Sequence, residues 1–147
     1  MEPMADAHTN DPKGAARANR EFYRAFERLD LEAMHAVWLD DDSVQCVHPA
    51  GERLVGRERV LGSWAAIFRA TESIAFELED LTIEIVGDLA WVSAVERIRA
   101  GPGASARSVD PRPAGEAVAT NLFVRRDGAW KLVLHHASPV ARRFFPG

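Results

Sequence analysis

The stretch that most constrains the fold is residues 73–100, which reads as two long strands with a bend in the first. Apolar residues alternate with polar ones up to Leu78, and the alternation resumes one position out of phase at Leu81. A β-bulge at Glu79-Asp80 produces such a slip, and bulges bend a sheet. Gly87-Asp88 then provides a two-residue hairpin turn. The stretch therefore predicts one curved antiparallel hairpin.

The remainder of the chain supplies helices first and more strands afterwards. Apolar residues at spacings of three and four predict helices over residues 14–29, directly after Asp30, and over 57–70. Alternation and the turn signals Pro49-Ala50-Gly51 and Asp127-Gly128 predict the other strands. These strands are residues 43–48, 52–55, 115–126 and 129–138. Helices grouped before a meander indicate an α+β fold with the helices on one face of one sheet.

The length and composition fit one domain. A chain of 147 residues can bury a substantial core. We expect a single domain over residues 14–140, preceded by a disordered lead-in at 1–13 and followed by a tail at 141–147. Residues 101–114 are rich in Gly, Pro and Ser, so they form either a lid or a plain connector.

Several classes of function are disfavoured by composition. The net charge of -4 and the lack of a basic run argue against nucleic-acid binding. No apolar run approaches the length of a membrane span. The single cysteine, Cys46, excludes an intramolecular disulfide and a CxxC metal site, which is consistent with the cytoplasm. Histidines and acidic residues lack metal-ligand spacing, so we expect neither a metal nor another cofactor.

Several short motifs, taken in order, point to a known family. They are Trp38 with the acidic run 40–42, the HPxG turn at 48–51, Gly56-Arg57, Ser63-Trp64, the ATNLF run at 119–123, and residues 125–139. In this order the chain resembles the NTF2-like superfamily over residues 15–139, in particular its SnoaL-like and ketosteroid-isomerase-like branches. The resemblance implies a cone-shaped fold, with three helices on the concave face of a curved, mostly antiparallel sheet. It also implies an apolar pocket and a homodimer formed through the outer sheet face.

His48 is the first candidate for a catalytic role. In the isomerases that the chain resembles, an Asp before the proline of the equivalent turn is the general base, and His48 occupies that position here. A histidine titrates near neutral pH and can take a proton from carbon or from a hydroxyl. The alternative is that His48 only hydrogen-bonds to the turn and closes the rim of the pocket.

Two further catalytic candidates rest on the same resemblance. Asn121 lies near the position where those isomerases place a protonated Asp that donates to an oxyanion. An Asn amide is a permanent donor, although a shift of one residue would bring Thr120 inward instead. The family's second donor, a tyrosine, aligns with Phe22, and Tyr23 lies one position on, roughly 100° around the helix. This difference argues against steroid isomerisation.

The remaining candidates would bind ligand. Alternation along the last strand predicts that His136 faces inward and His135 outward. His136 is then either a partner of His48 in acid–base chemistry or a buried core histidine. Gln45 lies on the opposite strand face from His48, and one of these two faces meets the pocket. The expected aromatic walls, or alternatively plain core, are Trp38, Trp64, Phe68 and Phe123.

Two functions are consistent with these features. The first is an apolar small-molecule pocket, with a cofactor-free isomerase, cyclase or dehydratase activity that uses His48 as the general base. The second is a non-catalytic module that dimerises or binds another protein through the outer sheet face and Phe144-Phe145. The fold alone does not decide between them, because one fold hosts many functions.

Overall fold

The computed structural model describes residues 11–104 and 115–140. Residues 1–10 of the expected lead-in, the tail with Phe144-Phe145 and residues 105–114 of the connector lie outside the described residues. Nine elements follow one another within the described residues. They are α1 (Lys13–Glu27), α2 (Leu31–Val37), β1 (Gln45–Val47), β2 (Arg53–Val55), α3 (Arg57–Ala70), β3 (Ile74–Val86), β4 (Leu89–Ala100), β5 (Gly115–Arg126) and β6 (Ala129–Pro139). Within the described residues no helix is long and apolar enough to cross a membrane.

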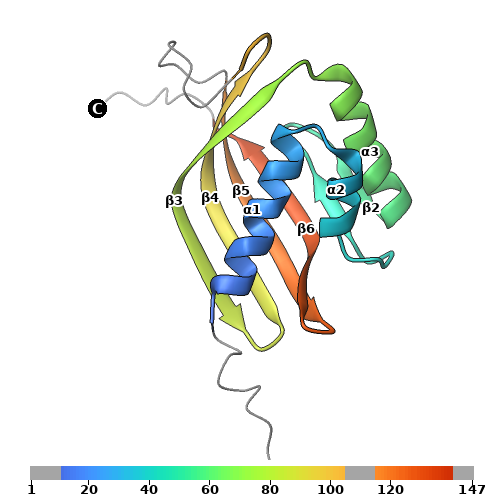
Figure 1. Cartoon of the computed structure of the whole chain (residues 1–147), viewed down its shortest axis with the longest axis vertical. Helices are drawn as coiled ribbons and strands as arrows, with labels where there is room; N and C mark the ends of the chain where they lie inside the picture. The colour runs from blue at the N-terminus through green and yellow to red at the C-terminus, as the bar shows by residue number, and fades with distance from the viewer. Residues whose placement is uncertain (1–10, 105–114, 141–147) are drawn as a thin grey trace, which may run out of the picture.

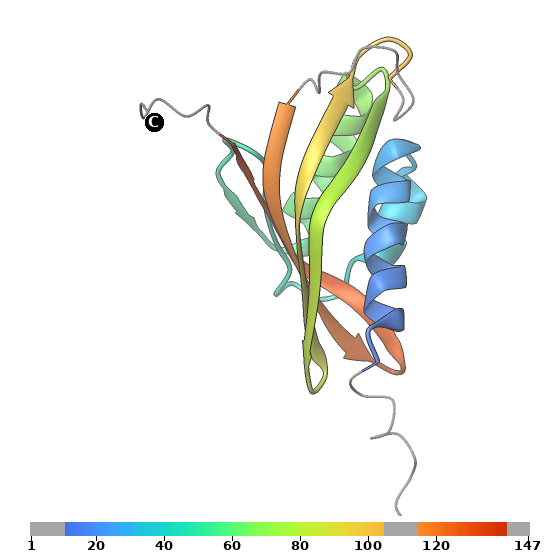
Figure 2. The ribbon, with the colours of Figure 1, turned by 90° about the vertical axis from the view of Figure 1, so that its left-hand side faces the viewer.

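One curved sheet organises the domain. Its strand order is β2-β1-β6-β5-β4-β3, and every pair is antiparallel except β1 with β6. α1 packs across β3, β4 and β6, while α3 packs against β1, β2 and α2 (Figure 1). Figure 2 shows the strands curving together with α1 along one of their faces. This arrangement confirms the predicted α+β fold with helices on the concave face.

A β-bulge in β3 confirms the bend expected from the sequence. Pairing with β4 shifts register between Glu79 and Thr82, where β3 carries one extra residue. Asp80 has a φ of 54°, a backbone conformation that is uncommon for residues other than glycine. The apolar residues on both sides of the bulge therefore face the same concave side.

A second bulge, in β6, overturns one prediction. Leu122 pairs with Leu134 but Phe123 pairs with Leu132, so Val133 is an extra residue in β6. The extra residue reverses the alternation of side chains beyond it. His135 is therefore buried, with 2% of its surface exposed, and His136 is exposed. The prediction that His136 faces inward and His135 outward was wrong.

Aromatic side chains form the core between the helices and the sheet. Phe22 contacts Trp64 edge-to-face with ring centroids 5.5 Å apart, and Phe26 lies 4.7 Å from Trp64 and 4.6 Å from Phe76. Such edge-to-face and tilted pairs add stability beyond their buried area. The amphipathic pattern of α1 thus positions aromatic rings directly over the concave face.

The short helix α2 is held at both ends by side chains. Asp30 accepts a hydrogen bond from the Ala33 N–H at 3.0 Å, which confirms it as the N-cap. Arg57 donates to the carbonyl oxygens of Leu39 at 2.8 Å and His35 at 3.2 Å. Because helix ends leave carbonyls without partners, this guanidinium ties α2 to the start of α3.

Candidate functional site

Five buried polar side chains meet on the concave face of the sheet, inside the aromatic core. Asn19 and Tyr23 come from α1, Glu96 from β4, Asn121 from β5 and His135 from β6. Asn19 and Tyr23 are four residues apart and share one face of α1. Polar groups at this depth are costly to bury unless they bond one another. We therefore treat these five side chains as one unit, the buried network.

The first half of the buried network fixes the proton of His135. Nδ2 of Asn121 donates to Oδ1 of Asn19 at 2.8 Å. Oδ1 of Asn121 lies 2.6 Å from Nδ1 of His135. Because an amide oxygen only accepts, Nδ1 of His135 carries the proton and Nε2 holds the lone pair. Burial, and behind it the charges of His48 and His136, lowers the pKa of His135 to about 3. His135 is therefore neutral at pH 7.

The second half of the buried network joins a phenol to a carboxyl group. The Tyr23 hydroxyl donates to Oε2 of Glu96 at 2.6 Å. Burial raises the pKa of Tyr23 well above its usual value, and the charge of Glu96 adds to this effect. Burial also raises the pKa of Glu96, although the hydrogen bond from Tyr23 opposes the change. The Asn121 side chain acts in the opposite direction and lowers the pKa of Tyr23, which couples this pair to the first half.

His48 stands at the edge of the same aromatic core. Its Nε2 lies 2.9 Å from Oγ of Ser63, whose own proton goes to the Val60 carbonyl oxygen at 2.6 Å. The Ser63 oxygen must therefore accept from His48, which places the proton on Nε2 and the lone pair on Nδ1. Burial lowers the pKa of His48 to about 4, so this imidazole is also neutral at pH 7.

The Cys46 thiol beside His48 is not a nucleophile. Its Sγ lies 3.6 Å from Nε2 of His48, and the side chain is fully buried. Burial raises the pKa of Cys46 to about 12, so the thiol stays protonated near neutral pH. A Cys–His pair reacts as a thiolate, which this environment disfavours.

The two imidazoles are brought together around Trp64. The ring centroids of His48 and His135 are 6.3 Å apart. Trp64 lies 4.8 Å from the first ring and 5.8 Å from the second. Its Nε1 is buried and, among the described residues, has no hydrogen-bond partner. Buried polar groups are normally satisfied, so this N–H is an unused donor in a ring that contacts both imidazoles.

The structure brings several of the predicted residues to this region. Asn121 and Tyr23 lie in the buried network, and Asn121, not Thr120, faces inward. His48 and Trp64 contact each other, and Phe68 packs on Trp64 at 5.9 Å. The Tyr23 hydroxyl donates its one proton to Glu96, and one N–H of the Asn121 amide donates to Asn19.

Other predicted residues lie elsewhere. Gln45 lines a cavity of about 350 Å³ on the outer sheet face, together with Leu122 and Leu134. His136 pairs with Thr120 on that outer face. Trp38 lines a separate cavity of about 550 Å³ beside Arg57. Phe123 is fully buried in the core.

Sequence reasoning missed three members of the buried network. Glu96 is the acidic residue in the otherwise apolar concave face of β4, a signal that strict alternation from Ala90 reveals. Asn19 lies one turn before Tyr23 and interrupts the apolar stripe of α1. Nothing in the sequence indicated that His135 faces inward, because its orientation depends on the bulge in β6. Across residues 11–104 and 115–140, no group of three or more His, Cys, Asp or Glu could hold a metal ion.

Comparison with known proteins identifies relatives for nearly the whole domain. Residues 16–142 match the model of the SnoaL-like domain. A candidate dehydratase of the NTF2-like family from Streptomyces avermitilis is 37% identical, with a TM-score of 0.79, and the match covers 94% of this chain and 99% of that one. A candidate calcium/calmodulin-dependent protein kinase type II association domain from Thiobacillus denitrificans is 31% identical, with a TM-score of 0.75, covering 86% and 94%.

A plant protein is also similar. The F-box protein SKIP8 of Arabidopsis thaliana is 31% identical over 120 residues, which are 82% of this chain. The match covers 47% of the plant protein, so this chain corresponds to about half of its length.

Proposed function

The chain belongs to the SnoaL-like domain family of the NTF2-like superfamily, and we propose that it is a cofactor-free enzyme acting on small apolar carbonyl compounds. The observation that supports this proposal is the pair of neutral imidazoles, 6.3 Å apart, around the unused N–H of Trp64. Of the three reactions expected from the sequence, dehydration is favoured, because the candidate dehydratase is 37% identical over 94% of the chain.

The chemistry would be elimination of water from a β-hydroxy carbonyl compound. Nδ1 of His48 takes the proton from the carbon next to the carbonyl group, and the negative charge moves to the carbonyl oxygen. Nε1 of Trp64 donates a hydrogen bond to that oxygen, as donors do in an oxyanion hole. The carbon–oxygen bond then breaks, and the imidazolium of His48 returns its proton to the leaving hydroxyl. The products are water and a conjugated carbonyl compound, and His48 is neutral again.

His48 is suited to this role by its pKa and by its position. A base must be unprotonated before it acts, and burial keeps the His48 pKa near 4. The Ser63 hydroxyl accepts from Nε2–H, so the lone pair is on Nδ1, which lies 3.9 Å from Sγ of Cys46. His48 is partly exposed, whereas His135 is buried, so the proposed base is the imidazole nearer to solvent.

The buried network holds the second imidazole, that of His135, in place. Tyr23 and Asn121 were expected to contact the enolate, but the Tyr23 hydroxyl donates to Glu96 and Nδ2 of Asn121 donates to Asn19. We assign them instead to positioning His135, whose Nε2 lone pair accepts a hydrogen bond from a substrate hydroxyl. This assignment makes His135 a group that orients substrate and leaves the proton transfers to His48.

The test is turnover of aryl β-hydroxy ketones, followed by the absorbance of the conjugated product. His48→Ala should lower kcat about 10²- to 10⁴-fold, the usual contribution of a general base, while binding measured by thermal shift changes little. His136→Ala is the matched control, because that imidazole lies on the outer face. Equal loss of turnover in both variants, or equal loss of binding and turnover in His48→Ala, would contradict the proposal.

A second candidate is a non-catalytic dimerisation or protein-interaction module. It is favoured by the 31% identity to the candidate kinase association domain and by the apolar outer sheet face. Val118 is 44% exposed there, near a cavity lined by Leu122 and Leu134. Exposed apolar patches often mark interaction sites. We infer a homodimer through this face in either case, and light scattering of Val118→Glu against Glu116→Gln would detect its loss.

The two candidates make different predictions about small molecules. An interaction module would show no thermal shift with any carbonyl compound and no effect of His48→Ala. The proposed enzyme would show a thermal shift with a carbonyl substrate and a loss of turnover in His48→Ala. The cytoplasmic location and the independence of cofactors, expected from the sequence, stay predictions.

A further inference from the structure

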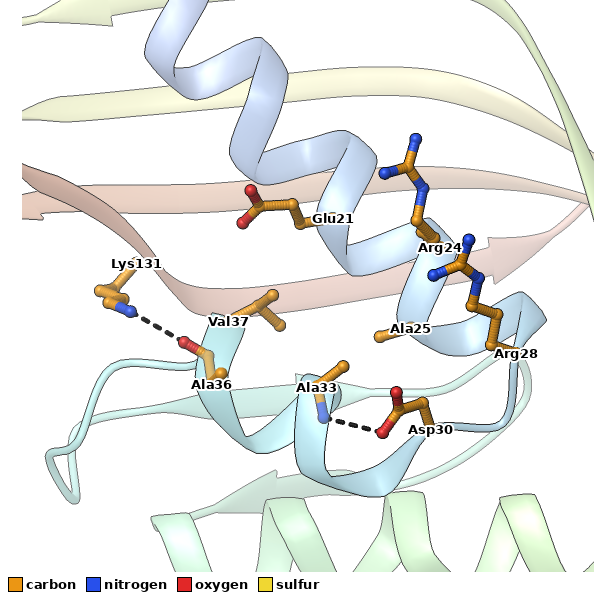
Figure 3. A pocket seen from close by; sticks show the side chains of 9 residues that line it. All are labelled: Glu21, Arg24, Ala25, Arg28, Asp30, Ala33, Ala36, Val37 and Lys131. Atoms are coloured by element: carbon orange, nitrogen blue, oxygen red, sulfur yellow. Dashed lines mark hydrogen bonds between the residues drawn. The ribbon is translucent and has the colours of Figure 1, made fainter.

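A cleft between α1 and α2 lies apart from His48, Trp64 and His135, none of which lines it. Its volume is about 260 Å³, and it is lined by the last turns of α1, by α2 and by Lys131 of β6 (Figure 3). We propose that this cleft binds a small organic oxyanion, a carboxylate or a phosphate monoester. The head group would lie between the guanidinium groups of Arg24 and Arg28, and a short apolar tail would lie on the floor.

Two of the charged groups in the cleft already have structural partners. Nζ of Lys131 donates to the carbonyl oxygen of Ala36 at 2.8 Å, which satisfies the C-terminal end of α2. Oδ1 of Asp30 accepts from the Ala33 N–H at 3.0 Å, which caps its N-terminal end. Both contacts are drawn in Figure 3. These groups therefore shape the cleft and hold its walls in place.

The two arginines have no such partner. Across residues 11–104 and 115–140, neither Arg24 nor Arg28 makes an ion pair or a side-chain hydrogen bond, whereas Arg57 and Arg125 do. Figure 3 shows the two side chains extending from α1 in a similar direction, with the Glu21 carboxylate turned away from them. Their spacing of four residues puts them on one helix face. Planar guanidinium groups match the geometry of carboxylate and phosphate.

The floor of the cleft is apolar and made of small residues. Ala25 and Val37 are buried, and Ala33 is partly buried beside them. Arginines at a helix C-terminus also interact favourably with the helix dipole, but that interaction does not require a cleft beside them. Ligand pockets for drug-sized molecules begin at roughly 300 Å³, so a volume of about 260 Å³ fits a smaller molecule. Charge and size together indicate a short-chain anion.

The test is an NMR titration of the full chain, observed through backbone amides, with three probes: sodium butyrate, butyl phosphate and inorganic phosphate. One of the butyl probes should cause saturable shifts in α1 and α2. Its affinity should fall at least tenfold in Arg24→Gln/Arg28→Gln. Arg17→Gln/Arg20→Gln is the matched control, because these exposed arginines of α1 do not line the cleft. The butyl probe that binds more tightly identifies the head group.

Other outcomes would overturn the proposal. They are absence of saturable binding, equal loss of affinity in the control variant, and inorganic phosphate binding as tightly as both butyl probes. If the double variant unfolds, Ala33→Leu fills the floor while keeping both arginines, and it should also abolish binding. His48→Ala should leave the titration unchanged, so the result is independent of the proposed dehydration.

Discussion

Replacing Tyr23 with Phe tests whether the buried network carries a negative charge. The substitution removes the hydroxyl that donates to Glu96 at 2.6 Å, and it leaves the rest of the ring in contact with Phe22 and Phe76. Glu96 is only 2% exposed, so water does not replace the lost donor. A hydrogen bond to a charged group contributes about 1.5–3 kcal/mol, and an unpaired buried charge costs about 3–5 kcal/mol. We expect Tyr23→Phe to lower the free energy of unfolding by about 3 kcal/mol at pH 8.

The pH dependence of this loss identifies Glu96 as its source. Burial raises the folded-state pKa of Glu96 above its unfolded value. The carboxyl therefore contributes its full stability below the unfolded pKa, and this contribution is lost as pH rises through the folded pKa. Removing the Tyr23 hydroxyl raises the folded pKa further, because that hydrogen bond lowers it. The destabilisation by Tyr23→Phe should be about 1 kcal/mol at pH 4 and about 3 kcal/mol at pH 8.

Thermal unfolding of five proteins at both pH values, namely the wild type, Tyr23→Phe, Glu96→Gln, the double variant and a control, measures the effect. A loss of about 3 kcal/mol corresponds to a decrease in Tm of about 6–12 °C for a domain of this size. Glu96→Gln removes the charge and keeps an acceptor, so Tyr23→Phe should cost less in that background at pH 8. Glu84→Gln, an exposed site on β3, is the control and should change stability by less than about 0.5 kcal/mol. A Tyr23→Phe loss that is the same at pH 4 and pH 8, or is unaffected by Glu96→Gln, would refute the reasoning.

Three shorter predictions concern protonation and packing. At pH 7, ¹⁵N NMR should show the proton on Nδ1 of His135 and on Nε2 of His48; the opposite tautomers would contradict the network. Gly14→Ala should destabilise the fold by about 1–3 kcal/mol in denaturant unfolding, because a Cβ there would lie 2.7 Å from Cδ1 of Trp130; wild-type stability would show that the ring moves freely. Arg57→Lys should cost more than about 1 kcal/mol, because one ammonium does not reach all the carbonyls that the guanidinium holds; a neutral result would mean that α2 needs no such contact.

The two bulges show why the fold was largely predictable and the site only partly so. In β3 the residues around Glu79 alternate between apolar and polar, so a slip of one position is visible in the sequence. In β6 the run from Leu132 to Leu134 is apolar at every position, so the sequence shows no alternation in which a slip of one position could be seen. The register there is set by pairing with β5. The inward turn of His135 therefore depends on a contact between distant residues, which local patterns do not contain.

The buried network was predictable to a similar extent. The resemblance pointed to Asn121 and aligned the family's tyrosine with Phe22, one residue before Tyr23; Asn121 and Tyr23 both lie in the network. Their partners Asn19 and Glu96 come from α1 and β4, more than 70 residues apart, and only the packing of the helix on the sheet brings them together. Local sequence identified the polar residues that a family motif marks. It did not identify the residues that satisfy them, because hydrogen-bond partners are chosen by tertiary structure.

The position of β6 in the sheet has a consequence for the order of folding. β6 is the last strand in the described chain, yet it lies between β1 and β5 and pairs in parallel with β1. During synthesis on the ribosome, β1 and β2 therefore emerge long before the strand that joins them to the rest of the sheet. Contacts between such distant segments slow folding. The first third of the domain can therefore join the sheet only after the last strand has been made. In a nascent chain that stops before Ala129, the edges of β1 and β5 that pair with β6 in the finished protein have no partner.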